Sequence, residues 1–195
     1  MTLPRGFLAQ AERHAARIRD ELGLGPADPI DIHAIARQLG VRVVAADELV
    51  DIARLQELER IQAFAFSACT IDIRGTKVIV FNSLRSPART QSDLAHEVSH
   101  LLLGHDLDEV RMVAGMPFRT CRPDQEEEAT NLGGALLLPR PLLLRATRRG
   151  LGVEEIAEQY GVTLDMARFR LNRTGVARQA GTHDRSSTAT CSRRA

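Results

Sequence analysis

Hydrophobic positions in the first part of the chain follow helical spacing and then extended spacing. Residues 6–22 carry alanine, isoleucine and leucine three or four positions apart and run into a stretch with glycine and proline, which predicts a first helix. Asp31 is suited to an N-cap and Gly40 to a C-terminal stop, so we expect a short second helix that ends at Leu39. The following residues 41–45 are mostly valine and alanine and predict a strand.

Strand-like runs with the sequences IQAFAFSA, TIDI and KVIVFN follow within residues 61–82. They contain many β-branched and aromatic residues, and the segment RGTK supplies a turn before the last run. These features predict a small antiparallel sheet. We interpret the strand around Val78 to Asn82 as an exposed edge that binds substrate backbone as an added strand.

The pattern becomes helical after Asn82. Thr90 followed by Asp93 forms a variant capping box and predicts a helix over residues 91–103. Residues 106–123 include one glycine and two prolines and are expected to form an irregular loop. A second long helix is predicted over residues 124–138, because a proline follows directly.

The rest of the chain predicts a helical module and a tail. Residues 153–173 suggest two helices around the turn Gly161-Val162-Thr163, as in a helix-turn-helix. Residues 182–195 are rich in serine, threonine and arginine and nearly lack apolar residues, which predicts disorder. We therefore divide the chain into a main domain at residues 1–145, a helical module at 146–177 and a disordered tail at 178–195.

Composition narrows the class of protein. With 195 residues, 44% hydrophobic and 26% charged, the chain has the balance of a globular protein. Its formal net charge of +1 gives no electrostatic reason to expect general binding to nucleic acid or membrane surfaces. It has neither an apolar run of about 18 residues nor a signal-peptide pattern, so we expect a cytoplasmic protein without a membrane span. Cys69, Cys121 and Cys191 lack a CxxC pair, which fits reduced thiols better than disulfides or a cysteine zinc site.

The strongest chemical signal is His96-Glu97-Val98-Ser99-His100, an HExxH motif. Residues four apart share a face of a helix, so both imidazoles can bind one metal ion. Glu97 lies beside them as a base for a water in the metal's open position, the arrangement of a zinc hydrolase. The alternative is a pair of surface histidines, but the apolar faces of this helix indicate burial, where unpaired polar side chains are costly.

A catalytic zinc takes a third protein ligand, and several residues compete for that role. Glu126, Glu127 and Glu128 begin the second long helix, although acidic residues there also stabilise the helix dipole. His105 is a further candidate, which we interpret by default as a cation at the helix C-terminus. Manganese or iron would also suit two histidines and a glutamate.

These residues resemble the ImmA/IrrE-type metallopeptidases. Members read AHExxHxLLH, then an acid three positions before an Ala-Asn pair, a Phe-Ala pair and Leu-Leu-Met-Pro. This chain matches that pattern at residues 95–100, at Ala129 and at residues 136–139. The resemblance implies that Glu126, three positions before Ala129, is the third zinc ligand.

The chain departs from the family pattern next to that glutamate. Thr130 replaces the usual asparagine, which weakens any role in supporting the metal ligands. Leu132-Gly133 replaces Phe-Ala, which we expect to loosen helix packing. Neither change removes a metal ligand or the base.

The resemblance covers about residues 5–145 and implies both a fold and an activity. The fold is an α+β, zincin-like metallopeptidase core with a helical C-terminal module. The activity is endoproteolysis, in which zinc held by His96, His100 and Glu126 activates a water while Glu97 transfers the proton. Members are typically intracellular and cut a helix-turn-helix repressor, so the implied partner is a protein substrate of that class. The sequence indicates no oligomeric state.

Other classes of function stay open for the segment at residues 153–173. Arg168, Arg170 and Arg173 on its second helix would suit a DNA-binding regulator. The near-neutral net charge favours instead a helical pair that packs on the core or docks a substrate. The third alternative, a catalytically idle scaffold, is disfavoured by the complete HExxH motif.

Overall fold

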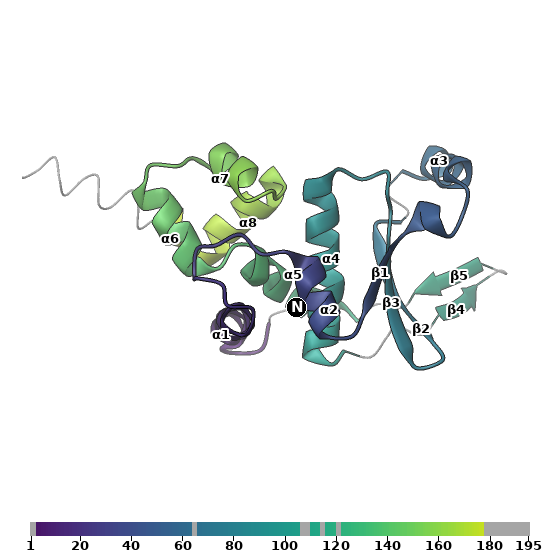
Figure 1. Ribbon diagram of the computed structural model, residues 1–195, viewed down its shortest axis with the longest axis horizontal. Helices are drawn as coiled ribbons and strands as arrows, with labels where there is room; N and C mark the ends of the chain where they lie inside the picture. Colours follow the sequence, from purple (N-terminus) through teal and green to yellow (C-terminus); the bar gives the residue numbers. More distant parts are fainter. Residues whose placement is uncertain (1–2, 64–65, 106–109, 114–115, 120–121, 178–195) are drawn as a thin grey trace, which may run out of the picture.

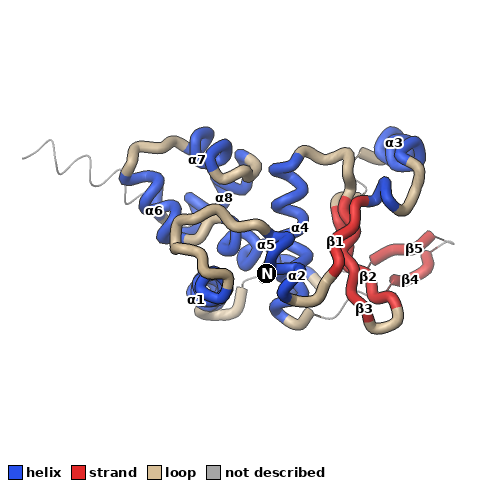
Figure 2. Tube along the Cα trace, viewed as in Figure 1, coloured by secondary structure: helices blue, strands red, loops and turns tan. Residues whose placement is uncertain are grey.

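The computed structural model describes residues 3–63, 66–105, 110–113, 116–119 and 122–177. A three-stranded sheet lies on one side of the long helix α4, and most of the other helices lie on the other side (Figure 1, Figure 2). The protein is therefore of the α+β class, as predicted. The elements in chain order are α1 (Phe7–Glu21), α2 (Ile32–Gln38), β1 (Arg42–Ala45), η1 (Ala46–Glu48), α3 (Ile52–Ile61), β2 (Ala68–Ile73), β3 (Thr76–Phe81), α4 (Pro87–Leu103), β4 (Val110–Val113), β5 (Met116–Arg119), α5 (Pro123–Leu137), α6 (Arg140–Arg148), α7 (Val153–Gln159) and α8 (Leu164–Thr174).

The sheet has the order β1-β3-β2 and is mixed. β2 pairs with β3 in antiparallel fashion as predicted, whereas β1 pairs with β3 in parallel. The prediction that β3 is an exposed edge is wrong, because this strand lies in the middle. Its residues Val78, Ile79 and Val80 are all buried, an unbroken apolar run that is typical of a central strand.

Two other sequence predictions also differ from the structure. In the run IQAFAFSA the described residues do not form the predicted strand, since Ile61 ends α3 and β2 begins only at Ala68; residues 64–65 lie outside the described part of the chain. Helix α3 went unpredicted because Leu55 is its only residue that is buried, which leaves little helical periodicity. The segment at 106–123 is not wholly irregular, because β4 and β5 pair there as an antiparallel hairpin.

Helix α4 begins earlier than the capping box at Thr90 and Asp93 suggested. Ser86 is the N-cap, and its hydroxyl accepts a hydrogen bond from the backbone N–H of Arg89. Pro87 follows at the first helical position, where a missing N–H costs nothing. Asp93 therefore lies inside the helix, where it pairs with Arg89 one turn earlier at 2.9 Å.

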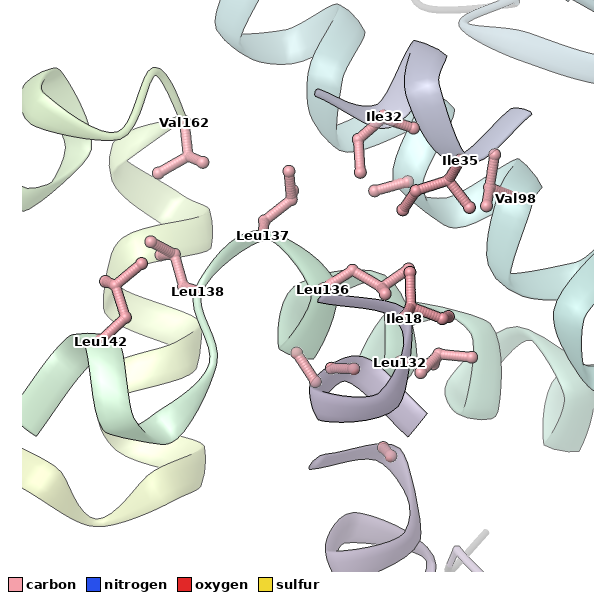
Figure 3. Packing of buried hydrophobic residues seen from close by; sticks show 14 of the residues in the cluster. Ile18, Ile32, Ile35, Val98, Leu132, Leu136, Leu137, Leu138, Leu142 and Val162 are labelled. Atoms are coloured by element: carbon pink, nitrogen blue, oxygen red, sulfur yellow. The ribbon is translucent and has the colours of Figure 1, made fainter. Parts of the chain in front are cut away.

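One hydrophobic core joins α1, α2, α4 and α5 to α6, α7 and α8. In Figure 3, Leu138, Leu142 and Val162 lie together where the end of α5 meets α6 and the turn before α8. The predicted boundary at residue 145 thus falls within a continuous core, and the division into a main domain and a module stays a prediction. The two helices and the turn expected within residues 153–173 are present, with Thr163 as the N-cap of α8. None of the described helices is long and apolar enough to cross a membrane.

Candidate active site

Three side chains from two helices bring one potential ligand atom each to a common point. His96 and His100 come from successive turns of α4, and Glu126 comes from the first turns of α5. The two Nε2 atoms of the histidines are 3.0 Å apart. Glu126 places Oε2 3.1 Å from Nε2 of His96 and Oε1 3.3 Å from Nε2 of His100. Within the described residues these three form the group that is suited to hold a metal ion.

Electrostatics link the carboxylate to both imidazoles. The imidazole of His100, and next that of His96, holds the pKa of the Glu126 carboxyl well below its usual value. All three side chains are only partly exposed. The site therefore favours the ionised carboxylate of Glu126 beside the two imidazoles. Two histidines and a carboxylate are a ligand set that zinc accepts.

Glycine lets α4 and α5 approach closely enough for this convergence. A Cβ atom on Gly133 would lie 3.0 Å from the carbonyl oxygen and 3.1 Å from the carbonyl carbon of Ala95. A larger residue would push the α5 backbone away from α4. The expected loosening at Leu132-Gly133 is therefore wrong, because Leu132 is fully buried and Gly133 permits tight packing.

Glu97 points from α4 toward the sheet and is nearly buried, with 6% of its surface exposed. The hydroxyl of Thr70 on β2 donates a 2.6 Å hydrogen bond to its Oε2. Thr70 was missed at the sequence level, since it lies 27 residues before Glu97 in a strand without any motif. The contact fixes the position of the side chain that was predicted to be the base.

The other residues that competed for the third ligand position have separate partners. His105 lies on the far side of His100, with the two Nδ1 atoms 2.9 Å apart. Glu128 accepts from Nε2 of His105 at 3.0 Å, and Glu127 pairs with Arg173 of α8. Neither glutamate is merely a partner for the helix dipole.

Thr130 also has a partner at the site. Its hydroxyl oxygen lies 3.4 Å from Nδ1 of His96, the ring nitrogen opposite the cluster. The threonine therefore keeps a contact with a candidate ligand, although a long one.

The cluster opens into a cleft of about 510 Å³. The start of β2 lines one part of it with Ala68, and α8 lines another with Met166 and Phe169. Asp93 also faces the cleft, where burial raises the pKa of its carboxyl and the hydrogen bond from Arg89 opposes that shift. Helix α8 thus contributes directly to the space around the candidate site.

The arginines of α8 do not form a basic face as the regulator interpretation requires. Arg170 is 2% exposed, donates to the carbonyl of Leu138 and pairs with Glu12 of α1. Arg173 bonds to Asn131 and Glu127 of α5. Of the three, only Arg168 has a mainly exposed side chain, and it lies 3.7 Å from Glu154.

A family model described as the IrrE N-terminal-like domain, Peptidase_M78, matches residues 36–172. The chain belongs to this family. The match confirms the resemblance found in the sequence, and it identifies the chain as a member of a peptidase family. The matched region extends from α2 into α8, and so includes most of the helical module.

A solved structure of a Mycobacterium tuberculosis transcriptional regulator has a similar fold. The TM-score is 0.53 and the sequence identity 20%, over 87% of this chain and 47% of the regulator. This chain therefore spans about half of the regulator's length, and the likeness concerns the fold alone. No match was found among curated proteins.

Proposed function

We propose that this protein is a zinc-dependent endopeptidase with a zincin-like core. His96, His100 and Glu126 are its metal ligands and Glu97 is its general base. The observation that carries the proposal is the convergence of Nε2, Nε2 and a carboxylate from two separate helices, with Glu97 next to it in one cleft. Membership in a peptidase family supports the same activity.

The donor set fits zinc in both chemistry and spacing. Tetrahedral zinc with bonds to nitrogen and oxygen of about 2.0–2.2 Å keeps its ligand atoms about 3.3–3.6 Å apart. Here the two Nε2 atoms are 3.0 Å apart, and each lies 3.1 or 3.3 Å from a different oxygen of Glu126, so small side-chain movements suffice. When bound, zinc supplies Lewis acidity that lowers the pKa of a water and polarises the scissile carbonyl.

Glu97 performs the proton transfers of the proposed reaction. Its carboxylate takes a proton from the attacking water and later delivers one to the leaving amine. The hydrogen bond from Thr70 holds Oε2, so the carboxylate does not have to be oriented anew in each turnover. Because the side chain is nearly buried, these transfers take place largely away from bulk water.

The proposed substrate is a protein, in particular a helix-turn-helix repressor as the family resemblance implies. Met166 and Phe169 give the cleft an apolar wall beside the candidate ligands, suited to an apolar substrate side chain. The similar structure is that of a transcriptional regulator, which is compatible with a role in transcriptional control. The alternative function, a DNA-binding regulator, has less support because Arg170 and Arg173 are bound to the core.

A pair of substitutions tests the assigned roles. Glu97→Gln is expected to abolish proteolysis of a helix-turn-helix repressor substrate while zinc content stays near wild type. His96→Ala is expected to lose both, because it removes a ligand. Zinc content is measured by elemental analysis after dialysis. If Glu97→Gln lost its metal as completely as His96→Ala, the proposed roles would be wrong.

The wild-type protein, incubated with candidate substrates, distinguishes a single target from general digestion and a peptidase from a regulator. Cleavage at one or a few bonds of the repressor, mapped by mass spectrometry, is the expected result. Rapid digestion of casein without preference would contradict a single target. Tight binding of the full chain to operator DNA without any cleavage would favour the regulator.

A further inference from the structure

Glu128 and His105 form a hydrogen-bonded chain that ends on the ring of His100. We infer that this pair positions His100 by holding its proton on Nδ1, which leaves Nε2 free to bind the metal. The inference deepens the proposed function, since it concerns support of the same site. It makes His105 and Glu128 positioning residues rather than ligands.

The direction of the two hydrogen bonds follows from the chemistry of the groups. A carboxylate only accepts hydrogen bonds, so the 3.0 Å contact with Glu128 places the proton of His105 on Nε2. With its proton on Nε2, His105 offers Nδ1 as an acceptor, and the 2.9 Å contact takes its proton from Nδ1 of His100. Nε2 of His100, the atom that faces His96 and Glu126, is then the nitrogen that offers a lone pair to a bound metal.

The backbone after α4 explains why His105 can reach the ring. Gly104 adopts a left-handed conformation with φ 67°, and His105 N–H then bonds to the carbonyl of His100. Together with the bond from Gly104 to Leu101, this closes a Schellman motif that folds the chain back under the helix end. His105 is buried as a result, with 9% of its surface exposed.

Helix geometry explains why Glu128 acts through an intermediary. Residues two apart on a helix point about 200° away from each other, so Glu126 and Glu128 cannot reach one ion together. Glu126 lies on the Nε2 side of His100, and Glu128 reaches the Nδ1 side by way of His105. Carboxylates behind ligating histidines orient the ring in this way and strengthen metal binding.

Neighbouring Glu127 provides a matched control. It lies between the two functional glutamates but pairs with Arg173 on α8 at 3.0 Å. Its removal breaks a tertiary contact of α5 without touching the hydrogen-bonded chain. A general effect of altering this helix can thus be separated from an effect on His100.

The first test is zinc affinity, measured in the full chain by competition with a chelator. His105→Phe keeps the ring's shape without its nitrogens, and Glu128→Ala removes the terminal acceptor. Each is expected to weaken zinc binding about 10–100-fold, the usual effect of removing such support. Glu127→Ala should stay within about twofold of wild type, because it does not touch the metal ligands. The double variant His105→Phe/Glu128→Ala should lose little more zinc affinity than His105→Phe alone, because both residues act through the same contact with His100.

The second test is the Nδ1–H proton of His100 in the protein saturated with zinc, observed by NMR. In the wild type this proton should be hydrogen-bonded and exchange slowly with water, and in His105→Phe it should exchange rapidly. Rapid exchange in the wild type, or equally slow exchange in His105→Phe, would overturn the inference. Should His105→Phe fail to fold, the same readout with Glu128→Ala decides, because glutamine would still offer an amide oxygen as acceptor.

The two proposals fail in different ways. Unchanged zinc affinity in His105→Phe and Glu128→Ala, alongside its loss in His96→Ala, would refute the positioning role and leave the peptidase intact. If the variants weakened zinc binding as expected but the wild type cleaved no protein, the proposed peptidase activity would be refuted and the positioning role would stand.

Discussion

The hydroxyl of Thr70 donates a 2.6 Å hydrogen bond to Oε2 of Glu97, joining β2 to α4 beside the candidate metal ligands. Thr70 is 5% exposed and Glu97 6%, so the contact is shielded from water. A buried hydroxyl–carboxylate bond is short and strong, because one partner is charged. The base of the proposed reaction is thereby fixed by the strand that also lines the cleft.

Thr70→Val, which keeps the shape and removes the donor, is expected to lower kcat about tenfold. A general base contributes about 10²–10⁴-fold to rate, and a less well oriented carboxylate forfeits part of that factor. KM and zinc content should change little, because Thr70 is hydrogen-bonded to Glu97 and to none of the three proposed ligands. Thr70→Ser should keep most of the activity, whereas an equal loss in both variants would indicate a packing effect. Steady-state kinetics with a repressor substrate provide the measurement.

Alanine substitutions at Glu126, Glu127 and Glu128 should lower the zinc affinity to different extents. Glu126→Ala should lose the most, because it removes a ligand. Glu128→Ala should be intermediate, through His105, and Glu127→Ala should resemble the wild type. Zinc content after dialysis and chelator competition give the ranking. Equal zinc retention in all three variants would contradict the ligand assignment.

Arg170→Met is expected to destabilise the protein by about 3 kcal/mol, since removing one partner of a buried ion pair leaves the other uncompensated. Arg170 links α8 to Glu12 of α1 and to the carbonyl of Leu138. The exposed Arg168→Met, two positions earlier on the same helix, should stay within about 0.5 kcal/mol of wild type. Chemical denaturation measures both. A smaller loss for Arg170→Met than for Arg168→Met would show that α8 is not anchored by this pair.

Phe169→Ala is expected to raise KM for the protein substrate on the order of tenfold with little change in kcat. Loss of an apolar contact made equally in the bound substrate and the transition state has this effect. Arg168→Ala, outside the lining of the cleft, is the control, and melting temperatures show whether both variants fold. Unchanged KM in a folded Phe169→Ala protein would mean that α8 does not bind substrate. Deleting residues 150–195 is a poorer test, because Ile156, Val162 and Ala167 belong to the core.

Local patterns in the sequence were sufficient for the features that depend on neighbouring residues. The HExxH spacing placed both imidazoles on one face of a helix because that face is set by a local periodicity. Gly104 marked the end of α4, and the pair of helices around Gly161 was visible for the same reason. The family was recognisable since its motif lies in two short blocks.

Tertiary structure decided whatever depends on contacts between distant segments. Strand order is one example, because hydrophobicity predicts a strand but not its neighbours, and β3 proved central rather than an edge. The distinct roles of Glu127 and Glu128 are another, since their partners come from α8 and from the end of α4. Thr70 reached Glu97 only through the packing of β2 on α4, which no spacing in the sequence encodes. Local hydrogen bonds and periodicity depend on residues that are close in the sequence, whereas side-chain partners depend on how the whole core packs.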